Sequence, residues 1–390
     1  MNNFVFCTPT KVIFGKGIEP TIGEHLRSFG AEKVLLHYGG GSAKRSGLLD
    51  RVTASLESAG LPYVELGGVA PNPKLSLIRK GIALCREEGV NFLLAVGGGS
   101  VIDSAKAIGV GLANGCDPWD FIESKTAPAK CAPVGVVLTL SAAGSEMSNS
   151  DVITNDENQL KRGITSEAVR PVVAFLNPEN TYTVSKFQTG CGIVDTMMHT
   201  LERYFTGDSD CDLTDRLAEG LLIAVRDAGR AAIANPEDYN ARATLMWASS
   251  LSHNDVTGCG KNRKFPVHKI EHDISGVHDN VAHGAGLAVL FPAWAEYVLQ
   301  YDVMKFAQLA VRVWGVEMNF DHPEVTAREG IRAMRAYFRE IGMPTTMGEL
   351  GISPDGYEEI VEKTTLGGTV LKSYLPLGRE EILEIYRLAE

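Results

Sequence analysis

Short runs of consecutive apolar residues punctuate the first half of this 390-residue chain. Runs of this kind, bounded by glycine, proline and polar residues, are typical of strands that are buried on both faces of a parallel sheet. Between them, apolar residues recur every three or four positions, which indicates amphipathic helices. The pattern predicts strands over residues 34–38, 92–96, 135–140 and 172–176, and helices over 20–29, 47–58, 74–89 and 100–113.

The pattern changes after about residue 185, where the strand-like runs give way to long amphipathic segments. These segments predict helices over residues 189–206, 213–233, 237–255, 264–276, 285–299, 301–314 and 325–341. Alternating strands and helices favour a Rossmann-like parallel sheet covered on both faces, and a run of helices favours a separate helical body. We therefore expect an α/β N-terminal domain over residues 1–185 and an all-α C-terminal domain over residues 186–390.

Composition narrows the classes of function. The net charge of −11 argues against a nucleic-acid binder, because phosphate binding needs a basic surface. No apolar run is long enough to span a membrane, and the first residues lack the charged and apolar regions of a signal peptide. The seven cysteines are dispersed without a CxxC pair, which is typical of reduced thiols. We expect a cytoplasmic protein that interacts with neither nucleic acid nor membrane.

A glycine-rich segment, Gly97-Gly98-Gly99-Ser100, directly follows the predicted strand 92–96 and opens a predicted helix. Glycines allow a sharp turn and close approach of a ligand, and the free N–H groups of a helix start favour an anion. The segment fits a pyrophosphate site, although a plain turn into a helix would have the same composition. Asp103, one turn along, could accept a hydrogen bond from a carboxamide or ribose, or favour the helix N-terminus as an anion. Lys106 is interpreted as a solvated side chain.

A second cluster, Gly39-Gly40-Gly41-Ser42, ends the predicted strand 34–38 and is followed by Lys44 and Arg45. Enzymes that use NAD commonly place an acidic residue near this point to bind the ribose 2′-hydroxyl. A hydroxyl with nearby cations suits the 2′-phosphate of NADP instead, although both cations could also simply face water. The sequence favours NADP(H) over NAD(H).

Two groups of potential metal ligands occur in the predicted helical half. Asp195 and His199 are four residues apart, so they project from one face of a helix and can bind the same cation. The second group consists of four histidines within a short stretch: His268, His272, His278 and His283. Each of these two groups, taken alone, could also consist of side chains that cap a helix or pack in the core. One carboxylate with imidazoles suits Fe(II), Zn(II), Ni(II) or Co(II), and the mixture does not decide among them.

Taken together, these motifs resemble the iron-containing (group III) alcohol dehydrogenases. The resemblance rests on Gly-Gly-Gly-Ser-Val-Ile-Asp-Ser-Ala-Lys at 97–106, on Asp195-Thr-Met-Met-His199, and on His268-x3-His272 leading to His283-Gly-Ala-Gly-Leu. It extends from Pro9-Thr-Lys-Val-Ile-Phe-Gly to the last helix. Within the family it is strongest toward the butanol dehydrogenases and broad-range NADPH-dependent aldehyde reductases. The motifs that indicate this branch are Tyr38-Gly-Gly-Gly-Ser42, Pro71-Asn-Pro73 and Asp117-Pro-Trp119.

The resemblance implies a homodimeric enzyme that interconverts primary alcohols and aldehydes, such as butanol and butyraldehyde, by hydride transfer with a nicotinamide cofactor. It implies a divalent metal, Fe²⁺ before Zn²⁺, held by Asp195, His199, His268 and His283, and it makes His272 the catalytic proton-relay group. The implied cofactor contacts are Gly40, Gly41, Ser42, Gly97, Gly98, Gly99, Ser100, Asp103, Thr139 and Lys161.

Two features depart from the family pattern. Many members read Thr-Thr-x-Gly-Thr-Gly-Ser-Glu where this chain has Thr139-Leu-Ser-Ala-Ala-Gly-Ser-Glu146, with fewer hydroxyls for cofactor contacts. The segment from His272 to His283 is one residue longer than in some members. Alternative functions are an NAD(H)-preferring dehydrogenase, a lyase similar to dehydroquinate synthase, and a non-catalytic metal- or nucleotide-binding protein. The lyase would need basic residues for an acidic phosphorylated substrate, and the metal region has few.

Overall fold

The computed structural model describes residues 1–208 and 210–390, which divide into two compact units. The sheet unit comprises Cys7–Val184 and Pro236–Asn254. The helical unit comprises Met1–Phe6, Ser185–Asn235 and Asp255–Glu390. Within the described residues, none of the helices combines the length and apolar character that crossing a membrane requires.

Six parallel strands form the sheet of the sheet unit, in the order β1-β8-β5-β4-β2-β3. The four predicted strands are confirmed as β2, β4, β5 and β8, while the edge strands β1 and β3 were not predicted. Asn177-Pro178 follows β8 directly and ends it. The strand bounds are β1 Lys11–Phe14, β2 Val34–Gly39, β3 Tyr63–Val69, β4 Phe92–Gly97, β5 Val134–Leu138 and β8 Val173–Leu176.

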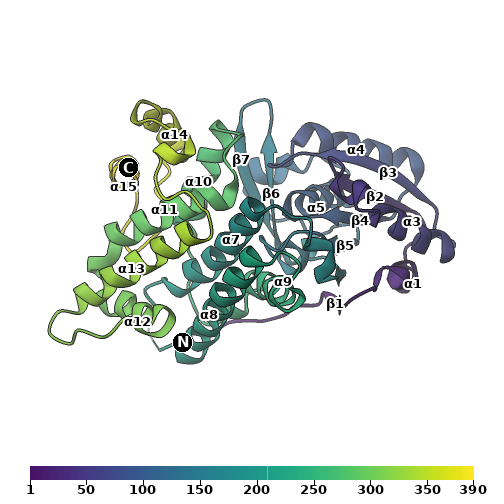
Figure 1. The fold of residues 1–390 in the computed structure, drawn as a ribbon. Coiled ribbons are helices and arrows are strands. Elements are labelled where there is room, and N and C mark those ends of the chain that lie inside the picture. The colour runs from purple at the N-terminus through teal and green to yellow at the C-terminus, as the bar shows by residue number, and fades with distance from the viewer. Residues whose placement is uncertain (209) are drawn as a thin grey trace. The chain divides into compact units, whose positions relative to one another are not determined.

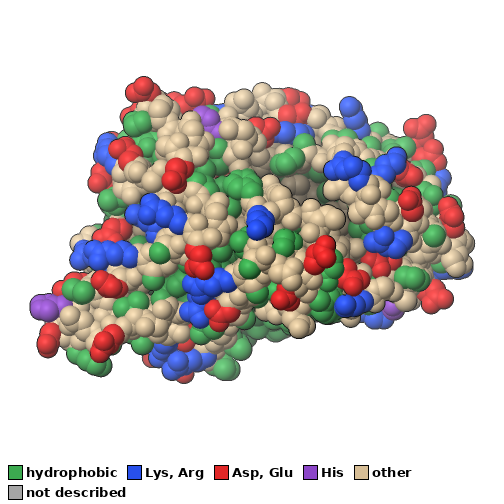
Figure 2. All heavy atoms as spheres, viewed as in Figure 1, with side chains coloured by type: hydrophobic (Ala, Val, Ile, Leu, Met, Phe, Trp, Pro, Cys, Tyr) green, Lys and Arg blue, Asp and Glu red, His purple; other side chains and the backbone are tan. Residues whose placement is uncertain are grey.

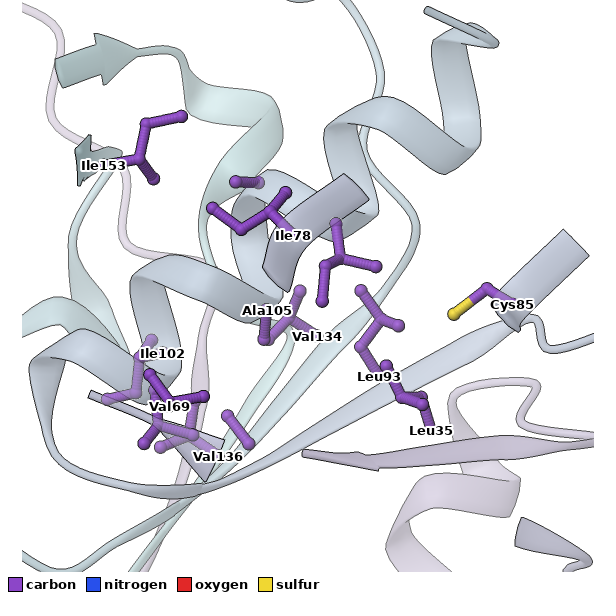
Figure 3. Packing of buried hydrophobic residues seen from close by; sticks show 14 of the residues in the cluster. Leu35, Val69, Ile78, Cys85, Leu93, Ile102, Ala105, Val134, Val136 and Ile153 are labelled. Carbon is purple, nitrogen blue, oxygen red and sulfur yellow. The ribbon is translucent and has the colours of Figure 1, made fainter. Parts of the chain in front are cut away.

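Alternate residues of the strands enter two hydrophobic clusters, one on each face of the sheet. Leu35 and Leu93 pack with α4 and α5 on one face, and Val34 and Phe92 pack with α1 and α3 on the other. Figure 3 shows the first cluster, where side chains of β2, β4 and β5 meet those of α4 and α5. The helices are α1 Ile22–Ser28, α2 Ser42–Arg45, α3 Leu48–Ser58, α4 Leu75–Glu88, α5 Gly99–Asn114 and α6 Trp119–Glu123.

An antiparallel hairpin, β6 Ser150–Asn155 with β7 Leu160–Thr165, adds a small second sheet to this unit (Figure 1). Helix α9, Tyr239–His253, also belongs here although it comes from the second half of the chain. Met246 of α9 enters the hydrophobic cluster of α4 and α5, and Ser250 donates a hydrogen bond to buried Glu146. These contacts explain why the sheet unit takes in Pro236–Asn254, whereas the sequence-based division placed all of residues 186–390 in one domain.

The helical unit contains eight α-helices among its described residues, with no named strand there, and this confirms the predicted fold class. Helix α7 packs against α8 and α11, and α10 packs against α11 (Figure 1). The helices are α7 Lys186–Tyr204, α8 Asp212–Ala234, α10 Pro266–Val277, α11 His283–Val298, α12 Val303–Trp314, α13 Pro323–Glu340, α14 Tyr357–Thr364 and α15 Arg379–Leu388. The last two, α14 and α15, were not predicted.

Basic and acidic side chains are interspersed on the face of each unit that Figure 2 shows. Neither sign gathers there into an extended patch.

Candidate functional site

Helix α7 carries the first pair of predicted metal ligands in the helical unit. It begins after Ser185, whose hydroxyl accepts a hydrogen bond from the backbone N–H of Gln188 and so caps the helix. From Thr189 onward its residues are all buried. Asp195 and His199 therefore lie one turn apart inside the unit, each about 5% exposed, as their spacing predicts.

Helices α10 and α11 supply the histidines of the second group. Pro266, which needs no N–H partner, occupies the first position of α10, and His268 follows in the first turn. His283 is the first residue of α11. The sequence between these helices contains a turn at residues 279–280, and this turn places the start of α11 beside α10.

One oxygen of Asp195 is the meeting point of three imidazoles. Its Oδ1 lies 3.4 Å from Nδ1 of His199, 3.6 Å from Nε2 of His268 and 3.8 Å from Nε2 of His283. Atoms bound at about 2.1 Å to a tetrahedral ion are about 3.4 Å apart, so these separations fit four ligands around one cation. The ligand atoms of Asp195, His199 and His268 all lie within 4.8 Å of one another, and His283 joins this group through Asp195.

The burial of these ligand atoms also supports a bound cation. Oδ1 of Asp195 and Nε2 of His268 are shielded from solvent, and neither has a hydrogen-bond partner within the described part of the chain. Leaving such atoms unpartnered is costly unless something else binds them. A mixed nitrogen and oxygen donor set of this kind fits a divalent transition metal.

His268 is held firmly among its neighbours. Its ring stacks on that of His199 at 4.5 Å between centroids, and the ring of Phe265 meets it edge-on at 5.3 Å. Burial lowers the pKa of His268, but the carboxylates of Glu202 and Asp195 outweigh burial and raise that pKa to about 9. The protein therefore favours positive charge at this position, which a divalent cation would supply.

The remaining two histidines of the group lie beside this cluster. The ring centroid of His272 is 5.4 Å from that of His283 and 6.4 Å from that of His268, and its side chain is partly buried. His272 also belongs to a second group of close ligand atoms, with Glu271 and His283. His278 follows the end of α10 and is not a member of either group among the described residues.

The predicted cofactor residues of the sheet unit collect at the carboxyl ends of three adjacent strands. Gly40, Gly41 and Ser42 follow β2, Gly97–Ser100 follow or end β4, and Thr139 follows β5, while β4 lies between β2 and β5 in the sheet. The backbone N–H of Thr139 donates to the carbonyl of Gly97 at 3.1 Å and so ties two of these ends together. Ligands of doubly wound sheets bind at this edge.

The start of α5 has the features of an anion-binding site. The helix begins at Gly99, and the backbone N–H groups of Val101 and Ile102 already donate to the carbonyl of Gly98. The N–H groups of Gly99 and Ser100 precede them at the helix start, where an anion can bind. A Cβ atom at Gly98 would lie 3.1 Å from Cβ of Leu140, and one at Gly99 would lie 3.0 Å from Cβ of Ala143. Glycine is favoured at both positions, because a Cβ atom there would force the segment after β5 to shift by a few tenths of an ångström.

Asp103 and Lys106 belong to a largely buried hydrogen-bond network. Asp103 accepts hydrogen bonds from Ser145 Oγ and from the backbone N–H of Val152. The interpretation of Lys106 as a solvated side chain is wrong. Its ammonium is fully buried and donates to Ser145 Oγ at 2.8 Å and to the carbonyl of Ser150 at 2.8 Å. The acceptors come from a segment some forty residues later in the chain, which the local helix pattern does not reveal.

Charge within this network is balanced by several carboxyl groups. Burial lowers the pKa of Lys106, and Asp103, Asp151 and Glu146 oppose that shift. Burial, reinforced by Asp103, raises the pKa of Asp151 to about 7. Lys161, a further predicted cofactor residue, is buried in β7 opposite Thr154 of β6. Its charge lowers the pKa of Asp103, against the larger effect of burial, so Lys161 lies in the same electrostatic environment.

Sequence reasoning missed two carboxylates in the helical unit. Glu202 contacts Nδ1 of His268, and Glu271 contacts Nδ1 of His283. Both side chains are fully buried, which is rare for glutamate. The sequence signal that could have found them is a charged residue within an otherwise apolar helical stretch.

Sequence profiles of known families match both halves of the chain. The profile described as iron-containing alcohol dehydrogenase matches residues 9–178, and the profile described as the C-terminal part of the Fe-containing alcohol dehydrogenase family matches residues 189–389. The chain belongs to the iron-containing alcohol dehydrogenase family. The resemblance inferred from the sequence motifs is thereby confirmed, and the protein is an alcohol/aldehyde oxidoreductase that uses a nicotinamide cofactor.

Individual members of the iron-containing alcohol dehydrogenase family are similar over almost the whole chain. NADH-dependent butanol dehydrogenase A of Clostridium acetobutylicum is 42% identical over 390 residues, with 99% of each chain covered. NADPH-dependent aldehyde reductase YqhD of Escherichia coli is 36% identical over 366 residues, with 93% of each chain covered. The crystal structure of NADH-dependent butanol dehydrogenase A from Thermotoga maritima matches with a TM-score of 0.96 and 38% identity, covering 100% of this chain and 99% of that one.

Proposed function

We propose that the protein interconverts primary aldehydes and alcohols with NADP(H) at a divalent metal ion held by Asp195, His199, His268 and His283. The observation that carries the proposal is the convergence of three imidazole nitrogens on Oδ1 of Asp195, at 3.4, 3.6 and 3.8 Å. Iron is the first candidate, because the family is named for it, and zinc is the second.

A divalent ion at this site would polarise the oxygen of the substrate and so favour hydride transfer at the neighbouring carbon. The chain's own contribution is to hold the ligands in place before the ion binds. Asp195 and His199 are fixed by the buried length of α7, and His268 is fixed by its stacking on His199 and by Glu202. Ligands positioned in this way bind an ion without further ordering of their side chains.

His272 is the proposed proton relay. Its imidazole lies next to the ligand cluster without entering the group around Asp195, and it is more exposed than His268. A histidine at such a position can pass a proton between the substrate oxygen and solvent near neutral pH. This role requires access to water, and His268 is buried whereas His272 is only partly buried.

The preference for NADP(H) is proposed from the residues at the end of β2. Gly41 adopts φ of 127°, which favours glycine, and turns the chain into the short helix α2 with Ser42 at its first position. Lys44 and Arg45 follow on the same helix, and both are exposed. A hydroxyl and two cations suit a phosphate group better than a free ribose hydroxyl.

The direct test compares kcat/KM for NADPH and NADH with butyraldehyde, using protein stripped of metal and protein reconstituted with Fe²⁺ or Zn²⁺. We expect turnover only after reconstitution and a preference for NADPH. Turnover that survives metal removal would contradict the metal-dependent mechanism. A preference for NADH, as the names of the two butanol dehydrogenases state for those enzymes, would leave the metal site intact and overturn only the proposed cofactor.

A further inference from the structure

Two histidines of the proposed metal site share an arrangement that the ligand set alone does not require. Nε2 of His268 and Nε2 of His283 both point toward Oδ1 of Asp195. Nδ1 of each ring contacts a separate carboxylate, Glu202 for His268 and Glu271 for His283. Both carboxylate side chains are completely enclosed.

This arrangement selects one tautomer of each imidazole. A carboxylate accepts a hydrogen bond, so Nδ1 must carry the proton and donate it. The lone pair of Nε2 is then directed at the site beside Asp195, where a metal ion would bind. Buried carboxylates that orient ligand histidines in this way also make the imidazole a stronger donor.

The carboxylates of Glu202 and Glu271 differ in their other hydrogen bonds. Glu202 also accepts hydrogen bonds from the backbone N–H groups of Val267 and His268, at 2.7 and 3.2 Å, so it caps the start of α10 as well. Removing Glu202 would therefore disturb the helix together with the site. Glu271 lies within α10, where the helix supplies the backbone hydrogen bonds, and its carboxylate is directed at His283.

The packing of α10 against α11 is shaped around Glu271. A Cβ atom at Gly286, one turn into α11, would lie 2.8 Å from Cγ of Glu271 and 3.0 Å from its Oε1. The missing side chain of Gly286 thus provides the space for the acid. His283 has the greatest need of an orienting partner, because its side chain is 26% exposed while those of Asp195 and His268 are 7% exposed.

We propose that Glu271 is a positioning residue, which holds His283 in the tautomer and orientation that bind the metal ion. This inference rests on the proposed function of the Asp195 site. The same atoms offer a competing assignment, since Glu271, His272 and His283 have ligand atoms within 4.8 Å of one another and could bind a second ion. Nδ1 of His283 already contacts the carboxylate of Glu271, so it is not available to an ion, and this favours the positioning role.

The test measures metal binding directly, on the full-length protein. Zn²⁺ and Co²⁺ dissociation constants are determined by chelator competition for the wild type, Glu271→Gln and Glu271→Asp, and the number of ions per chain is counted by elemental analysis. We expect one ion per chain and an affinity 10- to 100-fold weaker, as an order of magnitude, in Glu271→Gln. The visible spectrum of bound Co²⁺ should change as well. Glu271→Asp keeps the charge but shortens the side chain and so moves the carboxylate away from His283. It provides the same test of metal affinity if the glutamine variant does not fold.

The matched control is Glu219→Gln, which alters another buried glutamate of the helical unit. Glu219 accepts hydrogen bonds from Tyr204 and Arg312 and contacts none of the site histidines in the described structure. Its substitution should lower the thermal midpoint without changing metal affinity or the Co²⁺ spectrum. The control thus separates loss of a buried acid from loss of an orienting one.

Three results would overturn the inference in distinguishable ways. If both Glu271 variants bind metal within twofold of the wild type while Asp195→Asn loses it, the positioning role fails and the proposed function stands. If the wild type holds two ions per chain and Glu271→Gln holds one, Glu271 is a ligand and not a positioning residue. If the folded wild type binds no divalent ion, the proposed function and this inference fail together.

Discussion

Nε2 of His268 lies 3.6 Å from Oδ1 of Asp195, although the two residues come from different helices, α10 and α7. Both side chains are buried, and neither of these two atoms finds a hydrogen-bond partner in the described residues. The two groups attract each other, but at 3.6 Å they leave a buried carboxylate oxygen and a buried imidazole nitrogen without a hydrogen bond, which is costly. A shared cation satisfies both atoms, and this relationship is the centre of the functional account.

The buried ammonium of Lys106 supports the first prediction. Replacing it in Lys106→Met leaves Asp103 without its balancing charge and removes the donor to Ser145. Breaking a buried ionic contact in this way costs about 3–5 kcal/mol. We expect a fall of that size in the free energy of unfolding, measured with urea, and the exposed Lys80→Met should change it by no more than about 0.5 kcal/mol. Equal effects of the two substitutions would argue against the buried network.

The close approach at the start of α5 gives a second prediction. In Gly99→Val the new side chain would press on Ala143, whose Cβ would lie 3.0 Å from the added Cβ. Overpacking of this kind costs about 1–3 kcal/mol and displaces the N–H groups at the start of α5, which we propose bind the pyrophosphate. We expect at least about tenfold weaker NADPH binding by titration calorimetry, equivalent to 1.4 kcal/mol, with metal content unchanged.

The control for that variant is Gly220→Val in α8, where an added Cβ meets no atom within 4 Å. It should leave NADPH affinity as in the wild type. Should Gly99→Val also bind NADPH normally, the pyrophosphate is not held at the start of α5.

Cofactor preference depends on the charge at the end of β2. Ser42→Asp places a carboxylate where the account puts the 2′-phosphate of NADP, so repulsion should lower kcat/KM for NADPH and spare NADH. The ratio of the two kcat/KM values should shift toward NADH by at least about tenfold. Ser46→Asp, which introduces the same charge just after α2, should shift it much less. Identical ratios for all three proteins would show that the 2′-phosphate binds elsewhere.

His37 makes the stability of the sheet unit depend on pH. Burial lowers its pKa from 6.5 to about 4, while its ring contacts the carbonyl of Leu66 and the hydroxyl of Ser104. Because the folded pKa is the lower one, the unfolded chain takes up the proton first as pH falls. The contribution of neutral His37 is therefore complete above about pH 6.5 and is lost toward pH 4, a decrease of about 3 kcal/mol.

The measurement compares urea unfolding of the wild type and His37→Gln at several pH values between 7 and 4. The stability advantage of the wild type should shrink as pH falls, because glutamine does not titrate. An advantage that stays constant over this range would mean that His37 titrates alike in both states.

The sequence predicted the central strands well and the edge strands poorly, for a physical reason. Strands β2, β4, β5 and β8 are buried on both faces and read as continuous apolar runs. The edge strands β1 and β3 are only partly buried, and β3 includes Glu65 and two glycines, so their sequences lack that signal. The hairpin of β6 and β7 packs against α5 and carries many polar residues, which hid it as well.

Asp195 and His199 lie in one buried cluster, as expected from local spacing, because residues four apart share a helix face. Their role as metal ligands stays a prediction. Local spacing did not show that Lys106 is buried, since its acceptors at Ser145 and Ser150 lie far along the chain. Glu271 was missed for a similar reason. Its contact with His283 crosses from α10 to α11, and only the packing of those two helices creates it.

The proposed metal site is tested most directly by the metal content and turnover of Asp195→Asn beside the wild type. The substitution keeps the shape of the side chain but removes the charge on which three histidines converge. We expect the wild type to hold one divalent ion per chain and to oxidise NADPH with butyraldehyde, and the folded variant to lose both properties. A variant that retains a full equivalent of metal together with wild-type turnover would contradict the proposed site.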